Sequence, residues 1–174
     1  MNSSNDNYQA DLWERLASAF REYSKALREF FSERVDRVAL IRQALRTDDW
    51  YVALDVASYL KEEDHKQLFD LWVSGASYQK SVHIYRKFIL SLPREWVLER
   101  IEAEAERHLS EGGLEEYRRL LELYLLLDEE LTRKLAQRAL AHSDPDVIEA
   151  GQDFIEILGD EDRIKETRER LTPD

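Results

Sequence analysis

Residues 143–160, SDPDVIEAGQDFIEILGD, predict a complete α-helix together with its start and its end. Asp144 is a residue type that caps helix N-termini, and Pro145 suits the first helical position, where its missing N–H costs nothing. Gly159 is a natural C-terminal end. Between these ends, apolar or small residues recur at helical spacing, at Val147, Ala150, Gly151, Phe154, Ile155 and Leu158. We call residues 143–160 the template helix.

The composition indicates that the rest of the chain is helical as well. Only five of the 174 residues are Gly and three are Pro, while Leu, Glu, Arg and Ala are abundant. Apolar residues make up 43 %, which is enough to bury the core of one domain. We therefore predict an all-α fold of nine or ten helices, joined by turns so short that consecutive helices are antiparallel neighbours.

The beginning of the chain has a pattern of its own. Residues 1–7 are rich in Asn, Ser and Asp, and we predict that they are disordered. Over residues 12–45, apolar residues recur at steps of three and four without Gly or Pro, which predicts one long helix or two helices. We favour two, with a break near Ser32. The apolar stripe is interpreted either as the cap of a helical stack or as the seam of a homodimer.

Three other stretches match the template helix in part. The closest copy has its apolar and small residues at Tyr78, Ser81, Val82, Tyr85 and Ile89, and looser copies begin at Trp50 and Tyr117. The anchors Trp50, Tyr78, Tyr117 and Val147 lie 28, 39 and 30 residues apart. These spacings fall in the range of repeats built from pairs of helices.

The template helix resembles the second helix of a HEAT-type repeat. The resemblance lies in its Asp-Pro-Asp-x-Val start, its paired small residues and its Leu-Gly-Asp end. The stretch RTDDWYVALDVASYLKEED, residues 46–64, is similar. The family usually has an Arg after the Val, and this chain has Ile148 there. The resemblance implies a short right-handed α-solenoid of about four HEAT-like antiparallel helix pairs, a fold usually used to bind another macromolecule.

The resemblance also implies a division of the chain into segments. We expect a single helical-repeat domain over residues 8–171, followed by a tail at 172–174. Within the domain, residues 8–46 form the N-terminal long helix or helix pair, and residues 47–171 form the HEAT-like repeats.

The sequence offers little for catalysis. The absence of Cys excludes disulfides, thiolate nucleophiles and Cys-ligated zinc. Glu62 and His65 have the i,i+3 spacing of half a di-iron site, but the only other candidate pair, Glu104 and His108, has a different spacing, so we interpret Glu62–His65 as a solvated turn. There is no GxSxG motif and no Gly-rich phosphate loop. We expect no metal, no cofactor and no enzymatic activity; a lyase-type or metal-dependent enzyme on a helical-repeat scaffold is kept as an alternative.

The charge is strongly negative and unevenly distributed. The net charge is −12, and residues 88–174 carry 23 Asp and Glu against 12 Lys and Arg. This balance disfavours nucleic acids and anionic membranes and favours a basic protein partner. The longest apolar stretch is too short and too polar to span a membrane. The N-terminus lacks the features of a secretory signal, and with the absence of Cys this leads us to expect a cytoplasmic protein.

The predicted binding residues are the aromatic and acidic residues near the start of the second helix of each pair. Adjacent residues on a helix face different ways, so at least one of Trp50 and Tyr51 should be exposed. Tyr and Trp dominate binding hot spots, and acidic neighbours would steer a basic partner. In HEAT-type stacks the second helices line the concave side, which by resemblance selects Asp48, Asp49, Trp50, Tyr51, Asp55, Tyr78, Tyr85, Asp144, Asp146, Glu149 and Asp153.

The sequence therefore favours a protein-binding module without enzymatic activity. Its mechanism would be stoichiometric occlusion or recruitment of a basic partner protein. A sharper form of this hypothesis is an immunity protein or antitoxin that covers the active site of a basic toxin. The alternative among binding proteins is an adaptor or scaffold subunit of a larger complex.

Overall fold

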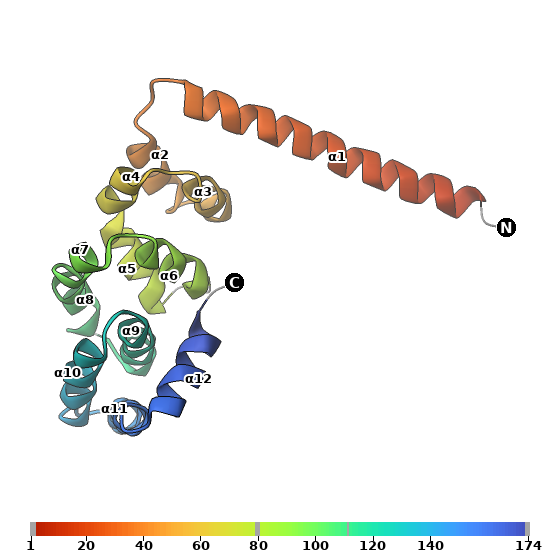
Figure 1. Cartoon of the computed structure of the whole chain (residues 1–174). Helices are drawn as coiled ribbons and strands as arrows, with labels where there is room; N and C mark the ends of the chain where they lie inside the picture. The colour runs from red at the N-terminus through yellow and green to blue at the C-terminus, as the bar shows by residue number, and fades with distance from the viewer. Residues whose placement is uncertain (1–2, 79–80, 111, 173–174) are drawn as a thin grey trace. The chain divides into compact units, whose positions relative to one another are not determined.

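The computed structural model describes residues 3–78, 81–110 and 112–172, and the side chains of residues 3–6 and Tyr78 lie outside that description. Over the described residues the chain is helical and has no strand, as the composition predicted (Figure 1). The helices are α1 (Ser3–Ser32), α2 (Arg37–Ala44), α3 (Trp50–Ala57), α4 (Glu62–Gln67), α5 (Phe69–Tyr78), α6 (Val82–Leu90), α7 (Arg94–Leu98), α8 (Ile101–Leu109), α9 (Leu114–Leu127), α10 (Glu129–Leu140), α11 (Pro145–Ile157) and α12 (Glu161–Leu171).

The chain divides into two compact units, Met1–Leu40 and Ile41–Asp174. The first unit contains α1, which ends at Ser32, where the predicted break between two helices lies. Helix α1 begins at Ser3, so residues 3–7 are helical and not disordered as expected. The single domain expected over residues 8–171 stays a prediction. None of the described side chains of the first unit is buried.

Helix α9 is the centre of the second unit. It packs against α5, α8, α10, α11 and α12 (Figure 1). Its buried residues cover a wide face of the helix, on which Leu120, Leu121, Leu123 and Leu125 are fully inaccessible to solvent, while Glu115 and Arg118 are exposed on the opposite face. A wide apolar face needs more than one neighbour to cover it, which explains why several helices pack against α9.

Polar anchors hold the neighbours of α9 in place. Arg86 of α6 donates hydrogen bonds to the carbonyl oxygen of Arg119, at 3.1 Å, and to the carboxylate of Glu122, at 2.5 Å. Arg168 of α12 donates to the carbonyl oxygen of Leu125 at 2.8 Å. Each guanidinium thus joins two helices that are distant in the sequence, and the Arg86–Glu122 pair is largely shielded from solvent.

The template helix folds as predicted. The carboxylate of Asp144 accepts a hydrogen bond from the backbone N–H of Asp146 at 2.9 Å, and Pro145 is the first residue of α11. A Cβ atom on Gly151 would lie 2.8 Å from the carbonyl oxygen of Ala136 in α10. The small residue is therefore required by the close crossing of α10 and α11.

Helix α5 contains two residues of types that often mark helix ends. Gly commonly ends a helix and Ser commonly caps one, but α5 continues through Gly75 and Ser77 to Tyr78. The ring of Tyr85 packs against Gly75, where a Cβ atom would lie 2.3 Å from the ring carbons. The buried hydroxyl of Ser77 donates to the carbonyl oxygen of Val73 at 2.8 Å, within the same helix. Both residues thus serve packing inside a helix, and α6 begins only at Val82.

The described residues form more helices than the nine or ten predicted. Glu62 and His65, interpreted from the sequence as a solvated turn, lie in α4, which covers Glu62–Gln67. After Pro93 the chain forms two short helices, α7 and α8. At this division the guanidinium of Arg100 lies over the ring of Trp96, 4.6 Å from its centroid, and donates to the carbonyl oxygen of Trp96. No helix of the described residues has the length and apolar character needed to cross a membrane.

Candidate protein-binding surface

Helix α3 exposes apolar residues on its outer side as well as burying them on its inner side. Ala53, Leu54 and Ala57 are buried, which is the inner face expected of an amphipathic helix. Trp50, Tyr51 and Val52, however, are 39 %, 61 % and 36 % exposed. Large apolar side chains that are clustered at a surface mark binding sites more often than scattered ones do. The N-terminal turn of α3 is therefore the first element of the candidate site.

Trp50 and Tyr51 line a groove between α3 and α6, which we call the α3/α6 groove. Its volume is about 410 Å³. Leu54 and Phe88 are its buried apolar residues, and the remaining lining residues are Trp50, Tyr51, Asp55, Ser58, Ser81, Ile84 and Lys87. A groove of this volume can receive a large side chain or a short segment of a partner.

Trp50 and Tyr51 both line the groove, although adjacent residues on a helix were expected to face different ways. Their rings are in edge-to-face contact, with centroids 6.1 Å apart and an interplanar angle of 86°. Trp50 is the first residue of α3, and its side chain reaches the groove from the end of the helix. The prediction that at least one of the pair is exposed is confirmed, since both are.

Acidic residues stand at the start of α3. Asp48 and Asp49 are exposed, and Asp49 occupies the N-cap position without a capping hydrogen bond from its side chain. The hydroxyl oxygen of Thr47 instead accepts from the backbone N–H of Asp49 at 3.2 Å. Among the described residues, no ion pair or hydrogen bond engages either carboxylate of Asp48 or Asp49. Together with Asp55 in the groove wall, they give this edge an acidic character.

Two of the predicted aromatic residues do not join this site. Tyr85 is only 6 % exposed, and its ring packs against Gly75 and lies 6.1 Å from the ring of Trp72. Its expected place at the surface is therefore corrected, because Gly75 leaves room for the ring in the core. Tyr78 is the last residue of α5, not the start of the next helix, and its side chain lies outside the description.

The predicted carboxylates of α11 do not line the groove either. Asp144 is occupied as the N-cap, and Asp153 forms an ion pair with Arg118 of α9 at 2.7 Å. Asp146 and Glu149 are exposed on α11. The structure thus brings together Trp50, Tyr51 and Asp55 at the groove and leaves the four acidic residues at α11 outside it, with structural roles for Asp144 and Asp153.

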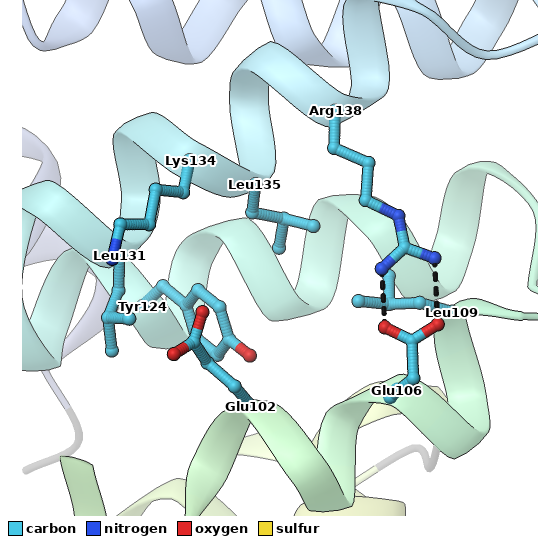
Figure 2. A pocket seen from close by; sticks show the side chains of 8 residues that line it. All are labelled: Glu102, Glu106, Leu109, Tyr124, Leu131, Lys134, Leu135 and Arg138. Carbon is cyan, nitrogen blue, oxygen red and sulfur yellow. Dashed lines mark hydrogen bonds and ion pairs between the residues drawn. The ribbon is translucent and has the colours of Figure 1, made fainter. Parts of the chain in front are cut away.

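A second, smaller hollow lies between α8, α9 and α10 (Figure 2). Its volume is about 110 Å³, well below that of sites for small organic ligands. The guanidinium of Arg138 donates to both carboxylate oxygens of Glu106, at 2.5 and 3.0 Å, and this lowers the pKa of Glu106. Burial raises the pKa of the nearby Tyr124 phenol. The Arg138–Glu106 pair joins α10 to α8, so a structural role explains both residues.

The residues that the sequence offered as candidate metal ligands contact other side chains of the protein. Glu62 forms an ion pair with Lys66 at 2.6 Å. His65 is buried between the rings of Trp72 and Phe88, and this burial lowers its pKa. Over the part of the chain that the structure describes, no group of three or more His, Asp or Glu side chains could hold a metal ion.

No family model, curated protein or solved structure matches the chain significantly.

The groove residues contributed by α6 and its N-cap, namely Ser81, Ile84, Lys87 and Phe88, were not among the predicted site residues. The apolar residues among them have the spacing of a face that packs in the core. Part of this face lines the groove only because α6 packs beside α3. The signal that did point to the site was the pair of adjacent aromatic residues after Asp48 and Asp49.

Proposed function

We propose that the chain binds another protein stoichiometrically, with the α3/α6 groove as the binding site and without bond chemistry. The observation that carries this proposal is the run of three exposed apolar residues, Trp50, Tyr51 and Val52, which continues into an apolar groove. Burying such side chains against a partner removes them from water, and Trp and Tyr are the residue types that dominate binding energies.

The charge distribution supports a basic partner. The exposed Asp48 and Asp49 directly precede Trp50 of the groove, and Asp55 lines it together with Lys87, while most of the net charge of −12 comes from residues 88–174. A field of this sign accelerates the approach of a positively charged protein and slows that of nucleic acids. The proposed partner therefore inserts an apolar or aromatic side chain into the groove and places Lys or Arg against the acidic edge.

The arrangement of helices that would present this surface is part of the proposal. Consecutive helices α5 and α6, α9 and α10, and α10 and α11 pack as neighbours. These contacts support the pairing of consecutive helices, and the arrangement of the pairs as a short right-handed α-solenoid of HEAT-like type is proposed from the resemblance. In such a stack, the chain acts by covering a partner surface, as an immunity protein or antitoxin covers a toxin, or by recruiting the partner to a complex.

The proposal is tested with the double variant Trp50→Ala/Tyr51→Ala. The tagged chain and the variant are used to capture partners from the native host, and the affinity for the recovered protein is then measured by calorimetry. We expect one basic protein at equal stoichiometry, and a loss of affinity of roughly 30-fold or more in the variant. Leu140→Ala is the matched control, since Leu140 is 40 % exposed like Trp50 but lies outside the groove.

Two results would contradict the proposal. If the double variant is folded by circular dichroism and retains full affinity, the groove is not the binding site. If the recovered partner is acidic, or if its affinity does not fall as salt is added, the acidic edge does not steer binding. Recovery of several subunits of one assembly would favour the adaptor function over occlusion.

A further inference from the structure

Helix α1 carries an apolar stripe that stays exposed for much of its length. The stripe consists of Tyr8, Leu12, Leu16, Phe20, Tyr23 and Leu27, at steps of three and four residues. Its first four members are all exposed, and Trp13 beside them is 69 % exposed. An amphipathic helix gains most of its stability from packing its apolar face, so this stripe calls for a partner.

The surface of α1 has a hollow that fits a side chain of another helix. The hollow has a volume of about 400 Å³ and is lined by Trp13, Leu16, Ala17, Phe20 and Arg21. The first four of these residues stand at positions i, i+3, i+4 and i+7. Four residues at these positions form the hole that receives one knob when two helices pack side by side.

We propose that α1 pairs with α1 of a second copy of the chain in antiparallel orientation. With the two-fold axis next to Phe20, Leu12 of each copy faces Leu27 of the other. Leu16 then faces Tyr23, which places the Tyr23 ring of the second copy at the edge of the hollow formed by Leu16 and Phe20. The same stripe thus supplies both surfaces, as a symmetric dimer requires.

The charges beside the stripe select the antiparallel orientation. Arg15 and Glu22 are exposed and seven residues apart, so they lie on the same flank of the stripe, two turns from each other. An antiparallel pair brings Arg15 of each copy to Glu22 of the other, which creates two ion pairs. In a parallel pair, Arg15 and Glu22 would instead lie against the opposite flank of the partner helix. That flank carries the small residues Ala17 and Ser24, which have no charge.

The apolar area is sufficient for a dimer that dissociates on dilution. Five exposed large side chains, each contributing on the order of 100 Å², and the half-exposed ones after them bury roughly 600 Å² per copy. The total of about 1,200 Å² is at the lower end of specific interfaces. A second copy is therefore large enough and complementary enough to cover the stripe.

The mass of the full chain in solution, measured by light scattering over a series of concentrations, tests the dimer. We expect a mass approaching twice 20.6 kDa at high concentration and 20.6 kDa for Phe20→Glu at all concentrations. Ser18→Glu is the matched control, because it adds the same charge on the opposite side of the helix, and it should remain dimeric. A monomeric wild type, as expected if α1 packs on its own chain or on another protein, would overturn the proposal.

Disulfide trapping tests the orientation, since the chain has no Cys of its own. A mixture of Leu12→Cys and Leu27→Cys chains should form a cross-linked dimer, and Leu12→Cys alone should not, because its two copies lie about 22 Å apart along the axis. Efficient cross-linking of Leu12→Cys alone would show a parallel pair and contradict the proposed register. Arg15→Glu should weaken the dimer roughly tenfold, and adding Glu22→Arg should restore it.

Discussion

Replacing Gly75 by Ala should destabilise the second unit, even though Ala is the better helix former. Gly75 lies inside α5 with the ring of Tyr85 against it. A Cβ atom there would be 2.3 Å from Cδ1 and Cε1 of the ring and 2.5 Å from Cγ. Carbon atoms are comfortable at about 3.5–4.0 Å, so the ring would have to move by more than 1 Å.

The size of the effect follows from two opposing contributions. Exchanging Gly for Ala within a helix gains about 1 kcal/mol. Forcing an additional carbon into a packed core costs about 1–3 kcal/mol, and the upper end applies because the Tyr85 ring is buried and has Trp72 as its neighbour. We therefore expect Gly75→Ala to lower the free energy of unfolding by about 1–2 kcal/mol.

A double-mutant cycle with Tyr85→Ala isolates the contact. Removing the ring costs about 3–5 kcal/mol by itself, but it also removes the clash, so that Gly75→Ala in this background should stabilise by up to about 1 kcal/mol. Urea unfolding of the four proteins, followed by circular dichroism, measures both steps. The reasoning is refuted if Gly75→Ala is more stable than the wild type or has the same effect in both backgrounds.

Three further predictions concern the polar groups of the second unit. Arg86→Ala should lower the free energy of unfolding by up to about 3–5 kcal/mol because it removes the closer cationic partner of the largely shielded Glu122 carboxylate and leaves only Arg119 at 3.9 Å, and Arg86→Ala/Glu122→Leu should recover part of the loss in urea unfolding. Asp128→Ala should cost about 1 kcal/mol by removing the N-cap of α10, whereas Asp128→Asn should cost much less, as thermal unfolding will show. Burial lowers the pKa of His65 below 6.5, so its imidazole stays neutral in the folded chain where the unfolded chain is already protonated. Stability should therefore be complete above pH 6.5 and decrease as the pH falls toward the lowered pKa, and His65→Leu should reduce this slope in a pH series of unfolding curves, with the remainder carried by His108, whose pKa burial also lowers.

The binding surface was predictable in part. The pair Trp50–Tyr51 was recognised because two adjacent large aromatic residues cannot both be buried on one helical face. Tyr85 was misplaced because it has the same apolar spacing as a surface anchor would have, and the sequence does not show which neighbour leaves room for its ring. The α6 side of the groove was missed for the same reason.

The sequence by itself determined the all-α class, the break after Ser32 and the limits of the template helix. These depend on interactions between residues a few positions apart, such as the Asp144 cap and Pro145 at the first turn. Only the tertiary structure decided that Gly75 continues a helix, that Tyr85 is buried, and that α3 and α6 enclose a groove. Each of these depends on contacts across many residues of chain, whose geometry is set by how the helices pack and not by the local pattern.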